Sequence, residues 1–311
     1  MRERLTPYLR TMSEKSPAIA TQHVRSELEE YDSNSFLTDP LAEDSHEVVK
    51  GLVHKYDNRA LIKATLRCAA HCRFCTRYRQ IGSPEGDLSK DDVGNIGNYV
   101  RDHPEINDVI LSGGDPLYVP KTAMDILQTL RPIDTVKVFR IGTRLPVHNP
   151  RSFDTPLLRE TVELADDIGK ERPFFVLMNF QHPDELTDET LRVVKMLRRT
   201  SMTLLSQTVF LKGVNNSTEV LRKLFEGLYH NGVMPYYIYR CDYARGVERF
   251  VCDIEEEQRI MTELRSSLSG IAYPTYVVDL PGHGKVPVPL SYWDGVDLSH
   301  ARDFKGQEIQ I

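Results

Sequence analysis

Three cysteines within eight residues are the strongest chemical signal in this sequence. Cys68, Cys72 and Cys75 are separated by three and then two residues, and the 311-residue chain has five cysteines in all. An odd, clustered set does not suit a disulfide framework, so in a reducing compartment these thiols are expected to bind a metal or a cluster. A [4Fe–4S] cluster normally takes four cysteine ligands. Three ligands from one loop would leave one iron open to an outside ligand, as in a catalytic metal site.

The alternative for this loop is a zinc site completed by His71 or by a remote cysteine. Structural zinc loops more often use two pairs of ligands, and the sequence contains no second pair. We therefore favour the cluster. Cys241 and Cys252 stand apart from the loop, and we expect both to be ordinary buried residues.

A lysine in an unusual setting is the second signal. Lys285 lies in the run Asp279-Leu-Pro-Gly-His-Gly-Lys285-Val-Pro. Glycine permits tight turns and proline fixes the flanking backbone, so such a loop can present an amine to a planar ligand. A desolvated lysine is the usual Schiff-base partner of a carbonyl cofactor. Taken alone, the run also fits an exposed turn lysine.

Alternating strands and helices must position these residues. Apolar, β-rich runs are followed by polar residues, and helix signals such as Thr187-Asp-Glu-Thr and Asn216-Ser-Thr-Glu lie between them. The expected strands are Ala60–Leu66, Asp108–Leu111, Val136–Ile141, Phe174–Met178, Met202–Val209, Met234–Tyr239 and Thr275–Val278. Chemistry at the end of every strand indicates an α/β fold, a full or partial (β/α) barrel of six or seven units, rather than an open doubly wound sheet.

The rest of the chain sets the context. We expect a mostly helical N-terminal extension over residues 1–50, with a helix over Ile19–Tyr31, a barrel over 51–280 and a C-terminal segment over 281–311 that carries Lys285. The formal net charge of −6 argues against nucleic acid as a partner. No run approaches a membrane span and no secretory signal is evident, so the sequence predicts a cytoplasmic protein without a membrane partner.

The cysteine loop resembles the signature of the radical S-adenosylmethionine (SAM) superfamily, CxxxCxxC after a strand. In that superfamily, three cysteines hold a [4Fe–4S] cluster, whose open iron binds the amine and carboxylate of SAM. The resemblance makes Cys68, Cys72 and Cys75 the ligands. The run Ser112-Gly113-Gly114-Asp115 after the second expected strand resembles the glycine-rich motif that holds the methionyl amine.

A longer set of segments resembles the lysine 2,3-aminomutase family, which uses pyridoxal 5′-phosphate beside the radical chemistry. They run in the same order from about residue 51 to 290. They are His54–Leu61, Cys72–Arg77, Leu111–Leu117, Arg140–Val147, Gly213–Asn216, Pro235–Asp242 and Pro281–Pro287. The resemblance implies an isomerase that moves the 2-amino group of a basic amino acid to carbon 3, most simply L-lysine to β-lysine.

The family's site residues carry over position by position. Lys285 would bind the pyridoxal phosphate aldehyde, Arg59 its phosphate and Tyr239 its ring, and Arg77 would hold the substrate carboxylate. Asn179 and Gln207 would contact SAM, although the family usually has histidine at the position of Asn179. Asp242 and Asp279 would hold the distal ammonium of lysine, because two carboxylates favour a cationic side chain and repel glutamate. The implied partners are an amino acid substrate and an external one-electron reductant.

Departures from the family leave alternatives open. The loop from Asp279 to Lys285 is one residue shorter than usual and contains His283, so Asp279 need not stay in register. The N-terminal part is shorter, and the C-terminus lacks the cysteine-containing extension that helps longer members oligomerise, so a homo-oligomer stays open. Arginine as substrate, radical chemistry without pyridoxal phosphate, and a non-enzymatic iron–sulfur or zinc protein are the other hypotheses.

Overall fold

One large sheet organises the chain. The computed structural model describes residues 2–30, 36–83, 86–290, 300–302 and 308–310. Its ten-stranded sheet has the strands in sequence order, from β1 at one edge to β10 at the other. The strands are β1 (Glu47–Val49), β2 (Leu52–Tyr56), β3 (Arg59–Thr65), β4 (Asp108–Gly113), β5 (Val138–Thr143), β6 (Phe174–Asn179), β7 (Thr203–Val209), β8 (Met234–Tyr239), β9 (Thr275–Leu280) and β10 (Gly284–Pro287).

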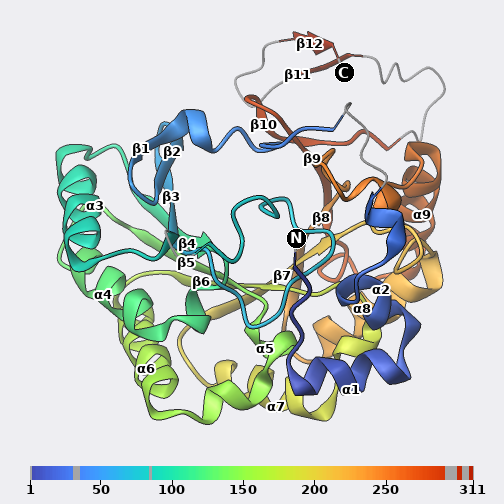
Figure 1. Cartoon of the computed structure of the whole chain (residues 1–311), viewed down its shortest axis with the longest axis horizontal. Helices are drawn as coiled ribbons and strands as arrows, with labels where there is room; N and C mark the ends of the chain where they lie inside the picture. The colour runs from blue at the N-terminus through green and yellow to red at the C-terminus, as the bar shows by residue number, and fades with distance from the viewer. Residues whose placement is uncertain (1, 31–35, 84–85, 291–299, 303–307, 311) are drawn as a thin grey trace.

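Strands β3 to β9 are parallel, and a helix follows most of them on the outside of the curved sheet (Figure 1). The antiparallel hairpins β1–β2–β3 and β9–β10 form its two ends. The outer helices are α3 (Lys90–Asp102), α4 (Pro120–Leu130), α6 (Pro156–Glu171), α7 (Asp188–Leu197), α8 (Thr218–His230) and α9 (Ile254–Ser267). A short strand pair, β11 (His300–Arg302) and β12 (Glu308–Gln310), lies apart from this sheet.

Burial alternates along the strands, and this alternation shows which face packs on the helices. In β4, Val109 and Leu111 are fully buried in the main core, whereas Ile110 and Ser112 are half-buried. Successive side chains of a strand point to opposite faces. The buried positions therefore pack under the helices, and the half-buried positions line the inner side of the curved sheet.

The partial barrel is confirmed. Because β1 and β10 are the two ends of the sheet and do not pair with each other, the barrel is open rather than closed. The expected strands from Ala60 to Val278 are all present within a few residues, and Thr187 and Ser217 cap α7 and α8 as the sequence indicates. No helix among the described residues is long and apolar enough to cross a membrane.

The N-terminal extension contains α1 (Pro7–Lys15), α2 (Pro17–His23) and two 3₁₀ turns, Glu27–Glu30 and Asp44–His46. The expected helix Ile19–Tyr31 is therefore wrong in length, and Tyr31 lies outside the described residues. The cause is a contact with the cysteine loop. The carbonyl of Gln22, which the next helical turn would need, accepts a hydrogen bond from the backbone N–H of Arg73 (2.7 Å).

Two glycines let the loop after β4 lie directly against the loop after β3. Gly113 has φ +106°, and a Cβ atom there would lie 2.3 Å from the carbonyl oxygen of Thr65. A Cβ atom on Gly114 would lie 2.2 Å from the carbonyl oxygen of Arg67. The backbone N–H of Gly114 donates to Thr65 O (2.6 Å) and that of Asp115 donates to Arg67 O (2.9 Å). Only glycine allows this approach, and the approach fixes the start of the cysteine loop.

Gly114→Ala should destabilise the fold, because backbone on both sides of the contact has little room to move. We expect a loss of about 1–3 kcal/mol in the free energy of unfolding, measured by urea titration. Gly94→Ala is the matched control. A Cβ atom on Gly94, within α3, would have no other atom within 4 Å, so alanine should stabilise the helix by about 0.5–1 kcal/mol. Equal stability of the two variants would contradict the close packing.

Candidate active site

The cysteine loop begins three residues after β3 and is held by the N-terminal extension. His71 donates its backbone N–H to Arg4 O (3.0 Å), and its Nδ1 lies 2.8 Å from Arg2 O. Cys68, Cys72 and Cys75 are half-buried free thiols. Burial raises the pKa of all three thiols, that of Cys75 to about 12. In the metal-free chain these sulfurs therefore keep their protons, and metal binding would have to release them.

The sulfur of Cys72 has a cationic neighbour that the sequence alone did not indicate. Arg144, which follows β5, donates from Nη1 to Cys72 Sγ at 2.8 Å. Its Nη2 donates to Gln22 Oε1 (2.5 Å) and to Glu185 Oε1 (2.8 Å). Arg144 is 6% exposed and Glu185 is fully buried, so this ion pair is little screened by solvent.

Two buried imidazoles lie on the other side of the same sulfur. His148 Nε2 is 3.5 Å from Cys72 Sγ and 3.3 Å from His23 Nε2. His23 Nδ1 lies 3.1 Å from Ile19 O, which can only accept a hydrogen bond, so Nδ1 carries the proton and Nε2 is the acceptor. Burial, followed by the charge of Arg144, lowers the pKa of His23 to about 3 and that of His148 well below its usual value. Both rings are therefore neutral.

The glycine-rich motif divides into two parts. Ser112 is half-buried on the inner face of β4, where its Oγ lies 3.4 Å from Arg77 Nη1. Asp115 is 2% exposed, and its carboxylate accepts hydrogen bonds from Thr143 Oγ1 and from the backbone N–H groups of Leu117 (3.0 Å) and Arg144 (2.8 Å). Burial raises the pKa of Asp115 to about 6. These hydrogen bonds join the loop after β4 to the end of β5, so Asp115 fixes the loop.

Asn179 and Gln207 are brought together at the ends of neighbouring strands. They are register partners in the β6–β7 pair. Gln181 donates from Nε2 to Asn179 Oδ1 (2.5 Å), and Gln207 donates from Nε2 to Tyr239 Oη (2.9 Å). Gln207 thus links the strand of Asn179 to the strand of Tyr239.

Arg77 is held by a carboxylate that the sequence did not indicate. Its Nε and Nη2 donate to the two oxygens of Glu43, at 2.7 and 2.5 Å, and its Nη1 donates to Gly113 O at 3.0 Å. Burial opposes the charge of Glu43, but Arg77 holds the pKa of Glu43 below its usual value. One side of the guanidinium is therefore occupied before any ligand binds.

The short loop before Lys285 forms a tight hairpin that keeps Asp279 in place. Lys285 and Asp279 are direct register partners between β10 and β9, so both side chains lie on the same face of the hairpin. Lys285 Nζ donates to Asp279 Oδ2 at 2.9 Å. Burial opposes the charge of Lys285, but Tyr239 and Asp279 raise its pKa above the usual value. The amine is therefore an ammonium ion when no cofactor is bound.

Asp242 and Asp279 form an acidic pair with few hydrogen-bond donors among the described residues. Among the described residues, Asp242 Oδ1 and Asp279 Oδ1 are both buried and have no hydrogen-bond partner. The nearest further cation is Lys55, whose Nζ lies 3.8 Å from Asp279 Oδ1. Burial lowers the pKa of Lys55, although Asp279 acts in the opposite direction. Lys55 and Lys285 are thus the cations that approach Asp279 in the described part of the chain.

Tyr239 and Arg59 flank Lys285 from different strands. Lys285 Nζ lies 5.9 Å from the centre of the Tyr239 ring. Arg59 stacks on the ring of Tyr56, with its guanidinium carbon 3.8 Å from the ring centre, and it pairs with no carboxylate in the described part of the chain. The hydroxyl of Tyr56 in turn accepts a hydrogen bond from the backbone N–H of Lys285 (3.3 Å).

The residues that sequence reasoning missed come mainly from the N-terminal extension and from β5. Glu43 follows Asp39-Pro-Leu-Ala, and its neighbour Ala42 has φ +51°, which is uncommon for a residue with a side chain. Gln22 and His23 gave no signal, because a glutamine and a histidine on an amphipathic helix are ordinary residues. Arg144 lies within the segment Arg140–Val147, for which the resemblance implies no role of this arginine.

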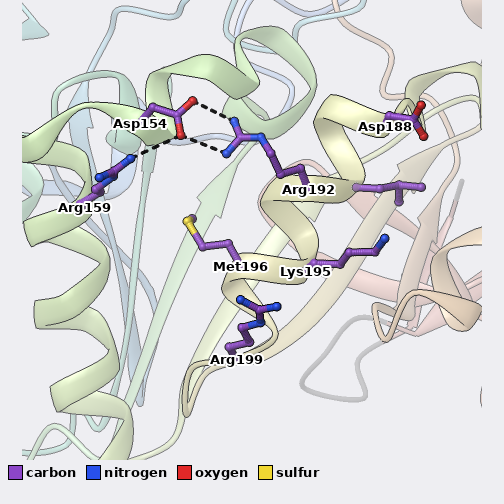
Figure 2. Close-up of a pocket in the computed structure, with 8 residues that line it drawn as sticks. Asp154, Arg159, Asp188, Arg192, Lys195, Met196 and Arg199 are labelled. Carbon is purple, nitrogen blue, oxygen red and sulfur yellow. Dashed lines mark hydrogen bonds and ion pairs between the residues drawn. The ribbon is translucent and has the colours of Figure 1, made fainter.

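A hollow on the outer surface carries none of the predicted site residues. Figure 2 shows Asp154 paired with Arg192 and Arg159 at this hollow. Its remaining lining residues are Asp188, Leu191, Lys195, Met196 and Arg199. The ion pairs here are well exposed, and such pairs contribute little. The predicted site residues Cys68 to Cys75, Arg77, Asp242 and Lys285 lie elsewhere, at the edge of the sheet where the parallel strands end.

Comparison with known proteins defines the class. The family model of the Radical SAM superfamily matches residues 62–225. A radical SAM methyltransferase from Sphaerobacter thermophilus has a similar structure, with a TM-score of 0.51 over 73% of this chain and 68% of that chain. At 14% identity this likeness supports the fold alone. The strand-end cysteine loop on this fold is that of a radical SAM enzyme.

Curated relatives narrow the class. The chain is 38% identical over 298 residues to L-lysine 2,3-aminomutase of Fusobacterium nucleatum, covering 94% of this chain and 68% of that protein. It is 35% identical over 315 residues to L-lysine 2,3-aminomutase of Clostridium subterminale, covering 98% and 74%. Glutamate 2,3-aminomutase of Clostridioides difficile is 33% identical over 277 residues, covering 88% and 64%. The chain belongs to the lysine 2,3-aminomutase family.

Membership implies a [4Fe–4S] cluster and SAM, and the donor set fits the cluster. Three free thiols share one loop, and the cation of Arg144 already lies against one of these sulfurs, where it would stabilise a thiolate. A protein of this class acts on a small amino acid and needs an electron donor.

The pH dependence of stability tests the electrostatics of Asp242. Burial, followed by the charge of Asp279, raises the pKa of Asp242 to about 7. In the unfolded chain the pKa of an aspartate is near 4, about three pH units below the value in the folded chain. Between these values the folded state holds the extra proton, so the contribution of Asp242 to stability falls as the pH rises. As the pH rises from 5 to 8, the free energy of unfolding of Asp242→Asn should therefore increase by about 1–3 kcal/mol relative to that of wild type, measured by urea unfolding.

Asp102→Asn is the control for that comparison, because it removes one exposed carboxylate at the end of α3. A constant difference between Asp242→Asn and wild type over this pH range would show that Asp242 ionises like an ordinary aspartate.

Proposed function

We propose that this enzyme moves the 2-amino group of L-lysine to carbon 3 and forms β-lysine, with pyridoxal phosphate bound at Lys285. The observation that carries the choice of substrate is a pair of buried oxygens, Asp242 Oδ1 and Asp279 Oδ1, which have no hydrogen-bond partner among the described residues. An unpaired buried acceptor is costly, and an ammonium group would supply the missing donors. The side-chain amine of lysine is such a group.

Charge balance supports a cationic side chain over glutamate. Without the cofactor, the ammonium of Lys285 is the hydrogen-bond partner of Asp279. A lysine bonded to a cofactor aldehyde is no longer available as that ammonium, and Lys55 at 3.8 Å is the remaining cation near Asp279 in the described part of the chain. A glutamate side chain would add a third carboxylate to this group, and like charges at such distances repel strongly when buried.

The chain's own groups fit the cofactor and the substrate. Lys285 lies beside the face of Tyr239, and Arg59 has no carboxylate partner in the described residues, which suits a phosphate. Arg77, fixed on one side by Glu43, would hold the substrate carboxylate with its remaining N–H groups. Ser112, Gly113, Gly114, Asn179 and Gln207 line the strand ends where SAM would bind, and Asp115 would support their loop.

When bound, SAM and the cluster supply a radical that removes hydrogen from the substrate, and pyridoxal phosphate carries the migrating nitrogen. The protein must hold carbon 3 of the substrate near the cluster and keep water out. Arg77 at one end and the two aspartates at the other fix the length of the amino acid that spans them. We further propose that a low-potential one-electron donor reduces the cluster and that the protein works in the reducing cytoplasm.

Product analysis tests the reaction directly. Protein reconstituted anaerobically with iron, sulfide, pyridoxal phosphate, SAM and dithionite should convert L-lysine into β-lysine, identified by mass spectrometry and chiral chromatography. L-Arginine and L-glutamate are the comparison substrates, and we expect lysine to be preferred at least tenfold. Release of deoxyadenosine with all three amino acids unchanged would keep the radical chemistry and reject this substrate. Conversion of glutamate alone would reject the role of the aspartates.

Variants separate the cofactor from the substrate. Lys285→Ala should lose the absorbance that pyridoxal phosphate gains on bonding to lysine, together with β-lysine formation. Asp242→Asn and Asp279→Asn should keep that absorbance but lower kcat/KM for lysine by a factor of about 100 or more, because each removes one buried charge partner of the ammonium. Asp166→Asn, on the outer helix α6, is the control. Unchanged kcat/KM in both aspartate variants would contradict the proposed ammonium site.

A further inference from the structure

We propose that Arg144 sets the reduction potential of the [4Fe–4S] cluster by hydrogen bonding to the sulfur of Cys72. The observation is the 2.8 Å contact between Arg144 Nη1 and Cys72 Sγ. A permanent cation that donates to a ligand sulfur stabilises the more negative, reduced cluster more than the oxidised one, and so raises the potential. This inference rests on the cluster alone and does not depend on the amino acid substrate.

Four anchors fix the guanidinium and the backbone of Arg144. Nη2 donates to Gln22 Oε1 and Glu185 Oε1, and the guanidinium carbon lies 5.1 Å from the centre of the Phe74 ring. The backbone N–H donates to Asp115 Oδ2. Neither anchoring carboxylate is more than 2% exposed. The donor is thus held in place and needs no rearrangement when the charge of the cluster changes.

The effect is directed at one of the three sulfurs. Within the described ranges, Cys72 is the cluster cysteine whose sulfur has an arginine donor, and His148 Nε2 lies 3.5 Å from the same atom. The N-terminal extension supports both neighbours of this sulfur, because Gln22 accepts a hydrogen bond from Arg144 and His23 Nε2 lies 3.3 Å from His148 Nε2.

The step concerned is the transfer of one electron. A low-potential donor reduces [4Fe–4S]²⁺ to [4Fe–4S]⁺ and is itself oxidised by one electron, and no bond forms or breaks at Arg144. By stabilising [4Fe–4S]⁺, Arg144 widens the range of donors that can load the cluster. Its contribution is therefore expected in the midpoint potential, independently of any reaction with an amino acid.

The test is a redox titration, followed by electron paramagnetic resonance, of the reconstituted protein without SAM or amino acid. In Arg144→Gln, the ratio of reduced to oxidised cluster at a given applied potential should be at least tenfold lower than in wild type. For a one-electron couple this corresponds to a shift of the midpoint potential by about 59 mV or more to negative values. Arg144→Lys keeps the charge and should lie between the two. Samples are compared at equal iron content, so incomplete loading does not enter the comparison.

Two controls separate this role from a purely structural one. Arg144→Gln leaves Glu185 as an unpaired buried charge, so the double variant Arg144→Gln, Glu185→Gln removes both charges, and it should still show the negative shift. Arg172→Gln removes an arginine that donates to the carbonyls of Ile133 and Val136 at the other end of the strands, and it should titrate like wild type. A wild-type potential in Arg144→Gln or in the double variant would overturn the proposal, as would a Lys variant as negative as the Gln variant.

Discussion

The buried carboxylate of Asp115 is the contact on which both halves of the cluster site depend. The backbone N–H of this residue binds the cysteine loop at Arg67, and its side chain accepts hydrogen bonds from the loop that follows β5. Three strand ends are thereby joined through the backbone and the side chain of one residue that is 2% exposed, where hydrogen bonds are strong and hard to replace. Gly113 and Gly114 make the junction short enough. Together with the contacts of the N-terminal extension, this junction positions the cysteine loop and Arg144.

Charge is divided along the site in a way that matches its chemistry. The cysteine loop lies among arginines, with Arg144 on a sulfur and Arg77 paired to Glu43. The opposite part, around Asp242 and Asp279, has carboxylates that exceed the fixed donors near them. Thiolates and a substrate carboxylate suit the first part, and an ammonium suits the second. On the proposed function, this division of charge would place the carboxylate of the amino acid toward Arg77 and its basic side chain toward the two aspartates.

Residues next in sequence to a recognisable pattern could be predicted, and residues supplied by a distant element could not. The strands from Ala60 to Val278 were readable from apolar runs, and Cys68, Cys72 and Cys75 from their spacing. Lys285 opposite Asp279 follows from the hairpin register, which the shorter loop had left uncertain. In contrast, the Glu43–Arg77 pair spans 34 residues and the Gln22–Arg144 contact spans 122. The end of α2 at His23 has the same origin, because a tertiary hydrogen bond to Gln22 overrides the local helical pattern.

The strict agreement between strand order and sequence order has a consequence for synthesis on the ribosome. Each strand from β2 onward pairs with the one made just before it, so the sheet can grow from one end without waiting for distant segments. The cysteine loop, the glycine-rich turn and Arg144 would all have emerged, with their supporting strands, more than 100 residues before Lys285. The segments of the proposed cluster site are thus complete in the nascent chain before Lys285 is synthesised.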